Sequence, residues 1–246
     1  MRFLRYFAAP VVALLSALPA AASTLSFQLS WQDPDSGATR TWNGSDQGTA
    51  TGAGQEESFA GRQVAASGLW ALDWDVRADV DPFVNGNFSI QNNSAITQTY
   101  TFTVTLPITP PVVPTSTIGG SIGVTVTDTN NSGSATVGSV GSGFVFNAAN
   151  DGTTTLQLLG PGFVLDAPFA GGSSTAFANA GLPGGTIASV EANGTISITH
   201  TFTLTAGDSI GLTSFYLVNP VPEPGTLALF ASGASGLLAL GRRRRS

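Results

Sequence analysis

Regular alternation of apolar and polar residues is the feature that most constrains the fold of this chain. Residues 24–32 place Leu25, Phe27, Leu29 and Trp31 on one side and polar residues on the other. Successive side chains of a β-strand point to opposite faces, so this pattern predicts a strand with one buried and one solvated face. The pattern recurs, more weakly in the last two runs, in residues 70–81, 96–106, 195–205, 117–127 and 208–218.

Turn-forming residues separate these runs. Asn-Gly pairs at 43–44, 85–86 and 193–194 predict hairpin turns, because both residues tolerate a positive φ. A proline cluster at 106–114 predicts a long connection or a sheet edge, since proline has no N–H to donate. Many short strands with this spacing predict an all-β domain, namely an antiparallel β-sandwich of the jelly-roll or Greek-key kind.

The first part of the chain, residues 1–22, has the layout of a secretory signal peptide. Two arginines precede an apolar stretch at residues 6–18, and small residues occupy the cleavage positions Ala20 and Ala22. We therefore expect signal peptidase to cleave before Ser23. An uncleaved anchor is the alternative, although the apolar stretch is short for a membrane span.

The body that remains, residues 23–219, is predicted to be one acidic domain. It holds three of the nine basic residues of the chain, no lysine, and all acidic residues except Glu223. Such a body repels phosphate groups and anionic lipids, so we expect no nucleic-acid partner, whereas divalent cations and neutral glycans are suitable ligands. The chain has no cysteine, so its core must form without disulfide bonds.

The last segment, residues 220–246, differs in character from the body. A Val-Pro-Glu-Pro motif at 221–224 is followed by an uncharged span at 225–241 and an arginine cluster at 242–245. The span has the minimum length for a transmembrane helix. Positive charge collects on the cytoplasmic side, so the body is predicted to lie outside. An ordinary tail anchor is the alternative.

A signal peptide, this motif, a short apolar span and terminal arginines together resemble the PEP-CTERM proteins of diderm bacteria. The resemblance implies that an exosortase recognises the motif, that the span anchors the chain transiently in the inner membrane, and that the arginines hold its end inside. The motif residues are Val221, Pro222, Glu223 and Pro224, and the topology anchors are Arg242, Arg243, Arg244 and Arg245.

The same resemblance implies export to the cell envelope or extracellular matrix, with signal peptidase and exosortase as partners during export. It also implies a link to extracellular polysaccharide and biofilm production. The body is similar to uncharacterised exported β domains that often precede such tails. This second similarity supports the fold and assigns no activity.

One segment of the body has the sequence of a calcium loop. Asp128, Asn130 and Ser132 stand at alternate positions before Gly133, as in the first half of a loop that binds calcium through oxygen atoms. The acid expected six residues after the glycine is replaced by Ser139, so the pattern is incomplete. An ordinary Asn/Gly turn is the alternative, and the segment DPDSG at 33–37 is a weaker second candidate. No other cofactor is predicted.

Two aromatic residues are further candidates. Trp42 is the one tryptophan outside the core-facing registers, so it is the predicted glycan contact. His200, the single histidine, lies in register with apolar residues, so we expect a hydrogen-bonded side chain near a sheet edge.

Three functions remain open. Without cysteine or lysine, and with one histidine, the usual nucleophile and base pairs are scarce, so we expect no enzyme. The leading hypothesis is a structural or adhesive component of an exopolysaccharide-rich envelope. The second is a carbohydrate-binding module, with or without calcium. The third is a glycan hydrolase, which would require two suitably spaced carboxylates in a cleft.

Overall fold

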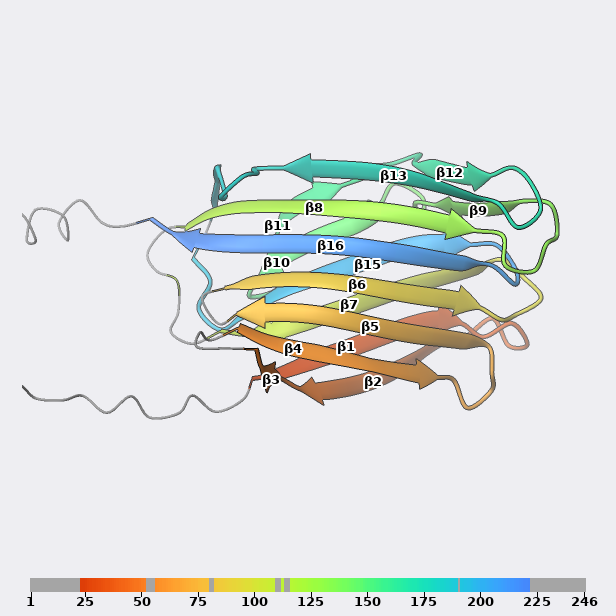
Figure 1. Ribbon diagram of the computed structural model, residues 1–246, viewed down its shortest axis with the longest axis horizontal. Coiled ribbons are helices and arrows are strands. Elements are labelled where there is room, and N and C mark those ends of the chain that lie inside the picture. Colours follow the sequence, from red (N-terminus) through yellow and green to blue (C-terminus); the bar gives the residue numbers. More distant parts are fainter. Residues whose placement is uncertain are drawn as a thin grey trace, which may run out of the picture.

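The computed structural model describes residues 23–51, 56–79, 82–108, 112, 116–189 and 191–221, which form two stacked β-sheets (Figure 1). The predicted signal peptide lies outside the described residues, as do Pro222, Glu223, Pro224, the apolar span and the arginine cluster. Within the described ranges there is no helix with the length and apolar character that a membrane crossing requires. The predicted all-β antiparallel sandwich is confirmed.

Sheet A contains eight strands. They are β1 (Thr24–Gln32), β2 (Thr39–Gln47), β7 (Gln98–Pro107), β9 (Ala135–Gly138), β10 (Phe146–Asn150), β11 (Thr153–Leu158), β12 (Val164–Ala167) and β15 (Thr195–Leu204). Their order is β11-β10-β15-β7-β1-β2, and β9 pairs with both β15 and β12. Strands β7 and β15 are neighbours although the chain passes through the other sheet between them.

Sheet B also contains eight strands. They are β3 (Thr49–Ala50), β4 (Glu56–Val64), β5 (Trp70–Asp79), β6 (Phe83–Asn92), β8 (Ser116–Thr127), β13 (Ser173–Ala180), β14 (Ile187–Ser189) and β16 (Ser209–Pro220). Their order is β13-β8-β16-β6-β5-β4-β3, with β14 beside β8. Strand β16 ends at Pro220, one residue beyond the predicted body, and this residue pairs with Ser116.

The predicted hairpin turns at the Asn-Gly pairs are wrong. Residues 43–44 lie within β2 and residues 85–86 lie within β6. In each strand the glycine leaves space for a large ring two positions away, because the ring of Trp42 covers Gly44 and that of Phe88 covers Gly86. The third pair, 193–194, lies in a bend immediately before β15. It is not a hairpin turn, because neither residue has a positive φ and the strands on either side, β14 and β15, belong to different sheets.

The core between the sheets is rich in aromatic rings. Phe102 of sheet A contacts Phe88 of sheet B, with ring centroids 5.0 Å apart. His200 lies among these rings, fully buried, and its Nε2 is 3.0 Å from Oγ of Ser214. It is hydrogen-bonded as expected. It is not near a sheet edge, because β15 lies between β10 and β7. Burial lowers the pKa of His200 to about 3.

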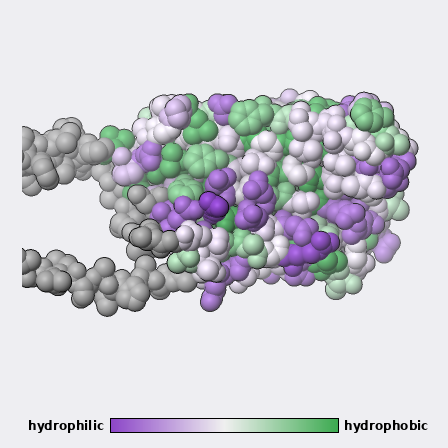
Figure 2. All heavy atoms as spheres, viewed as in Figure 1, coloured by the Kyte–Doolittle hydropathy of each residue, from purple (hydrophilic) through white to green (hydrophobic). Residues whose placement is uncertain are grey.

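The two ends of the sandwich differ in what they carry. Strand β1 begins and β16 finishes at the same end, which we call the terminal end (Figure 1). The opposite end, which we call the distal end, is formed by the loops 33–38, 65–69, 128–134 and 205–208. Between the ends, Figure 2 shows hydrophilic side chains over β4 and β5 and more apolar ones over β8 and β13, where Phe177 is 66% exposed.

Candidate functional site

All four tryptophans of the chain belong to one cluster that lies toward the distal end. The ring centroids of Trp31 and Trp70 are 5.2 Å apart, and that of Trp42 lies 5.9 Å from Trp70 and 6.5 Å from Trp74. Trp70 is buried, and the other three are half-buried against the core. Nε1 of Trp74 donates a hydrogen bond to Oδ2 of Asp46 at 3.0 Å. These contacts hold the rings in fixed orientations.

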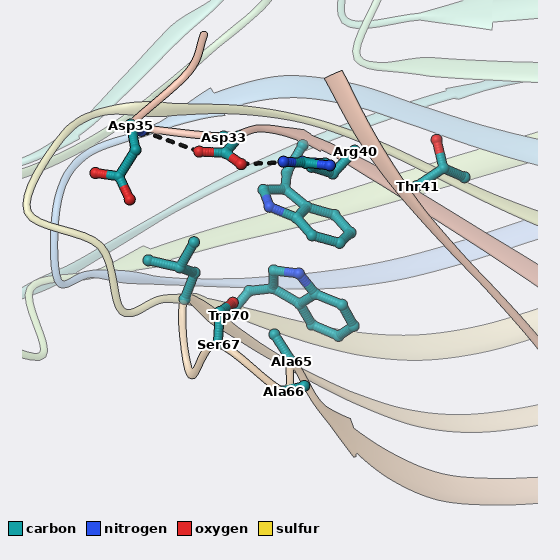
Figure 3. Close-up of a pocket in the computed structure, with 10 residues that line it drawn as sticks. Asp33, Asp35, Arg40, Thr41, Ala65, Ala66, Ser67 and Trp70 are labelled. Carbon is teal, nitrogen blue, oxygen red and sulfur yellow. Dashed lines mark hydrogen bonds and ion pairs between the residues drawn. The ribbon is translucent and has the colours of Figure 1, made fainter. Parts of the chain in front are cut away.

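A pocket of about 440 Å³ lies beside this cluster (Figure 3). Trp31 and Trp70 form its aromatic part. Two hairpin turns complete it, one from each sheet: residues 33–38 join β1 to β2, and residues 65–69 join β4 to β5. The pocket therefore lies between the edges of the two sheets. The stacking of the two sheets therefore sets the position of the pocket, and no single segment of the chain forms it.

An ion pair lies on the polar side of the pocket. Nε of Arg40 is 2.9 Å from Oδ2 of Asp33, and Oδ1 of Asp33 accepts the backbone N–H groups of Asp35 and Ser36 at 3.0 and 3.3 Å. The hydrogen bond from Arg40 and these two N–H donors lower the pKa of Asp33. Figure 3 shows the carboxylate of Asp35 turned away from this pair. The pocket thus offers a fixed ion pair and a second carboxylate.

This combination suits the binding of a saccharide. Indole rings pack against the C–H faces of sugar rings, and carboxylate and guanidinium groups bind hydroxyls. A glycosidase needs a general acid whose pKa is raised, so that it carries a proton near neutral pH. The lowered pKa of Asp33 keeps this group ionised instead.

The pocket does not coincide with the predicted glycan contact. Trp42 lies in the tryptophan cluster with its ring against Gly44, and Trp31 and Trp70 line the pocket. Sequence reasoning assigned Trp31 and Trp70 to the core alone and so missed this site. A usable signal was present, since Asp33 and Arg40 flank a short turn between aromatic-containing strands. A role for Trp42 in glycan binding stays a prediction.

The predicted calcium loop forms a compact turn after β8. Oδ1 of Asp128 accepts the N–H of Ser132 at 3.1 Å, and Oδ2 accepts that of Gly133 at 2.9 Å. Oδ1 of Asn130 also accepts the N–H of Ser132, at 2.7 Å. The structure therefore brings Asp128, Asn130 and Ser132 together. Among the described residues, no group of three or more His, Cys, Asp and Glu side chains could hold a metal ion, and calcium binding stays a prediction.

Comparison with known protein families identifies the tail. Residues 220–245 match the PEP-CTERM protein-sorting motif. A comparison with curated proteins finds no match for this chain. The chain therefore carries a PEP-CTERM sorting motif, which implies an exported protein that an exosortase sorts to the cell envelope or surface.

Proposed function

We propose that the β-sandwich is a non-enzymatic, adhesive component of an exopolysaccharide-rich envelope, and that it holds polysaccharide in the pocket of Trp31 and Trp70. The observation that carries this proposal is the pocket itself, in which the half-buried ring of Trp31, packed against the buried ring of Trp70, lies beside the Asp33–Arg40 ion pair. The sorting motif supports it, because the motif directs a protein to the cell envelope or surface, where extracellular polysaccharide is within reach.

The acidic body restricts the kind of polysaccharide. Asp33 and Asp35 line the pocket, so a polyanionic chain would be repelled there. Neutral or amino-substituted sugars avoid that repulsion, and their hydroxyl or ammonium groups can bond to the carboxylates. The proposed ligand is therefore a neutral or cationic extracellular glycan.

The test is a glycan array probed with the full-length protein, with and without calcium, next to two tryptophan variants. Trp31→Ala removes an aromatic wall of the pocket, and we expect it to weaken binding by roughly tenfold or more. Trp42→Ala is the matched control, because it removes a half-buried ring from the same cluster that does not line the pocket. We expect this variant to bind like the wild type.

Other outcomes would decide between the alternatives. If the wild type binds no glycan, the proposed adhesive contact is wrong and a purely structural role remains. Equal binding by the wild type and Trp31→Ala, with loss in Trp42→Ala, would move the site to Trp42. Release of shorter glycan products would instead identify a hydrolase.

A further inference from the structure

A second carboxylate lies against the loop at residues 128–133. Asp208 immediately precedes β16 and is fully buried. Its carboxyl group lies within hydrogen-bonding reach of that of Asp128 and also receives the backbone N–H of Thr129. Its Oδ2 accepts a hydrogen bond from the hydroxyl of Thr205, whereas its Oδ1 has no hydrogen-bond partner among the described residues. Adjacent buried carboxylates repel each other, and a buried oxygen without a partner is costly. A bound cation would remove both costs.

The loop already has the oxygen pattern of a calcium site. Asp128, Asn130 and Ser132 occupy its first, third and fifth positions, and the carbonyl of Ser134 occupies the seventh. The hydroxyl of Ser132 donates a hydrogen bond to that carbonyl oxygen at 3.1 Å, which holds these two oxygens side by side. Gly133, at the sixth position, has a φ of 107°, as the sharp turn in such a loop requires.

The fold holds Asp208 next to this loop. The hydroxyl of Thr129 donates to the carbonyl of Gly207 at 2.7 Å, and Nδ2 of Asn130 donates to the carbonyl of Ala206 at 2.7 Å. These bonds fasten the loop to the turn that leads into Asp208. The acid that the loop sequence lacks at Ser139 thus has a substitute in Asp208, which comes from a distant part of the chain.

We propose that Asp128, Asn130, Ser132 and Asp208 form a calcium site in which Asp208 supplies the acid that is missing from the loop. Two carboxylates offset the charge of the ion, and the neutral oxygens complete its shell. Calcium fits such a mixed set of oxygens better than magnesium, which requires near-ideal octahedral geometry. This site is separate from the tryptophan pocket and does not depend on glycan binding.

The experiment is calorimetric titration of the EDTA-treated, full-length protein in detergent with calcium chloride, supported by thermal unfolding with and without calcium. We expect the wild type to bind calcium and to unfold at a higher temperature when calcium is present. Asp208→Asn keeps the shape of the side chain but removes its charge. It should weaken binding by roughly tenfold or more, and Ser132→Ala, which keeps the backbone N–H, should weaken it as well.

Asp151→Asn is the matched control. The carboxylate of Asp151 also accepts three backbone N–H bonds in a turn, at the terminal end of the sandwich. This variant should bind calcium like the wild type. The proposal is overturned if the wild type does not bind millimolar calcium, if Asp208→Asn and Ser132→Ala bind it unchanged, or if magnesium chloride gives an equal stabilisation.

Discussion

The two ends of the sandwich each contain an aspartate that organises a turn, but the surroundings of the two carboxylates differ. At the terminal end, Asp151 accepts the backbone N–H groups of residues 193–195, at 2.6 to 2.9 Å, and lies exposed. At the distal end, Asp128 accepts three N–H groups in the same way but is buried against Asp208. At the terminal end this pattern of hydrogen bonds therefore closes a simple turn. At the distal end the same pattern belongs to a cluster of two carboxyl groups.

The pKa values of these groups follow the difference. Partial burial alone would raise the pKa of Asp151, but its three N–H donors outweigh this effect and lower the pKa. Burial raises the pKa of Asp208, and the negative charge of Asp128 adds to the increase. The N–H donors of Asp128 likewise outweigh its burial and lower its pKa, so the two ends differ electrostatically in the buried Asp208, whose pKa is raised. Carboxyl groups with raised pKa values cluster at functional sites, so we expect the functional sites at the distal end.

The substitution with the largest expected effect alters the sorting tail, which follows the terminal end of the sandwich in the sequence. Glu223→Ala changes the centre of the sorting motif matched at residues 220–245. We expect this variant to stay with the inner-membrane fraction while the wild type is processed and delivered to the envelope, as cell fractionation and immunoblotting would show. Because the exchange leaves the folded body unchanged, the purified variant should still bind glycan.

A control for this comparison is Glu191→Ala, which removes an exposed acid from the terminal end of the body. It should be processed like the wild type. If Glu223→Ala is processed and released normally, the motif is not what directs sorting, and an ordinary tail anchor would explain the apolar span.

A second prediction, with a smaller expected effect, concerns the pH dependence of stability. It tests whether the two ends of the sandwich unfold as one cooperative unit. The pKa of His200 is about 3 in the folded protein and near 6.5 in the unfolded chain, so below pH 6.5 the unfolded chain binds a proton that the folded one does not. The free energy of unfolding should therefore fall as the pH drops from 6.5 to 5, by up to about 1.4 kcal/mol per pH unit.

Urea unfolding measures this slope with two probes. Tryptophan fluorescence reports the distal cluster and far-ultraviolet circular dichroism reports all strands, and we expect coincident transitions. In the double variant His200→Leu/Ser214→Ala the slope between pH 6.5 and 5 should largely disappear. Transitions that separate as the pH falls would show that the ends unfold independently.

The sequence predicted strands in which apolar and polar residues alternate. It missed β6, whose burial alternates as regularly, because Gly86 and Asn92 occupy buried positions and the pair 85–86 predicted a turn. Strand β1 has its predicted bounds, and β7 and β15 differ from their predicted bounds by one or two residues. In β7 and β15 every second side chain is buried, and in β1 this holds up to Leu29. Strands β2 and β13 were missed. They lie at sheet edges and have no fully buried residue, so they lack the apolar alternation on which the prediction depends.

The sites were less predictable, since both depend on contacts between distant segments. Asp128 and its loop could be found from their spacing, but the contact with Asp208 exists only because β8 and β16 are neighbours. The pocket likewise needs the β1–β2 and β4–β5 turns to meet at one end of the sandwich. Local patterns therefore identified single residues, and only the topology shows which of them meet.

The most direct test of the difference between the ends is hydrogen–deuterium exchange of the full-length protein, with and without the extracellular polysaccharide it binds. The account predicts that bound polysaccharide slows exchange at the distal end, in residues 31–41 and 65–70, and leaves residues 151–153 and 193–195 at the terminal end unchanged. Slower exchange at the terminal end alone, or along the exposed face of β4 and β5, would contradict the assignment of glycan binding to the distal pocket.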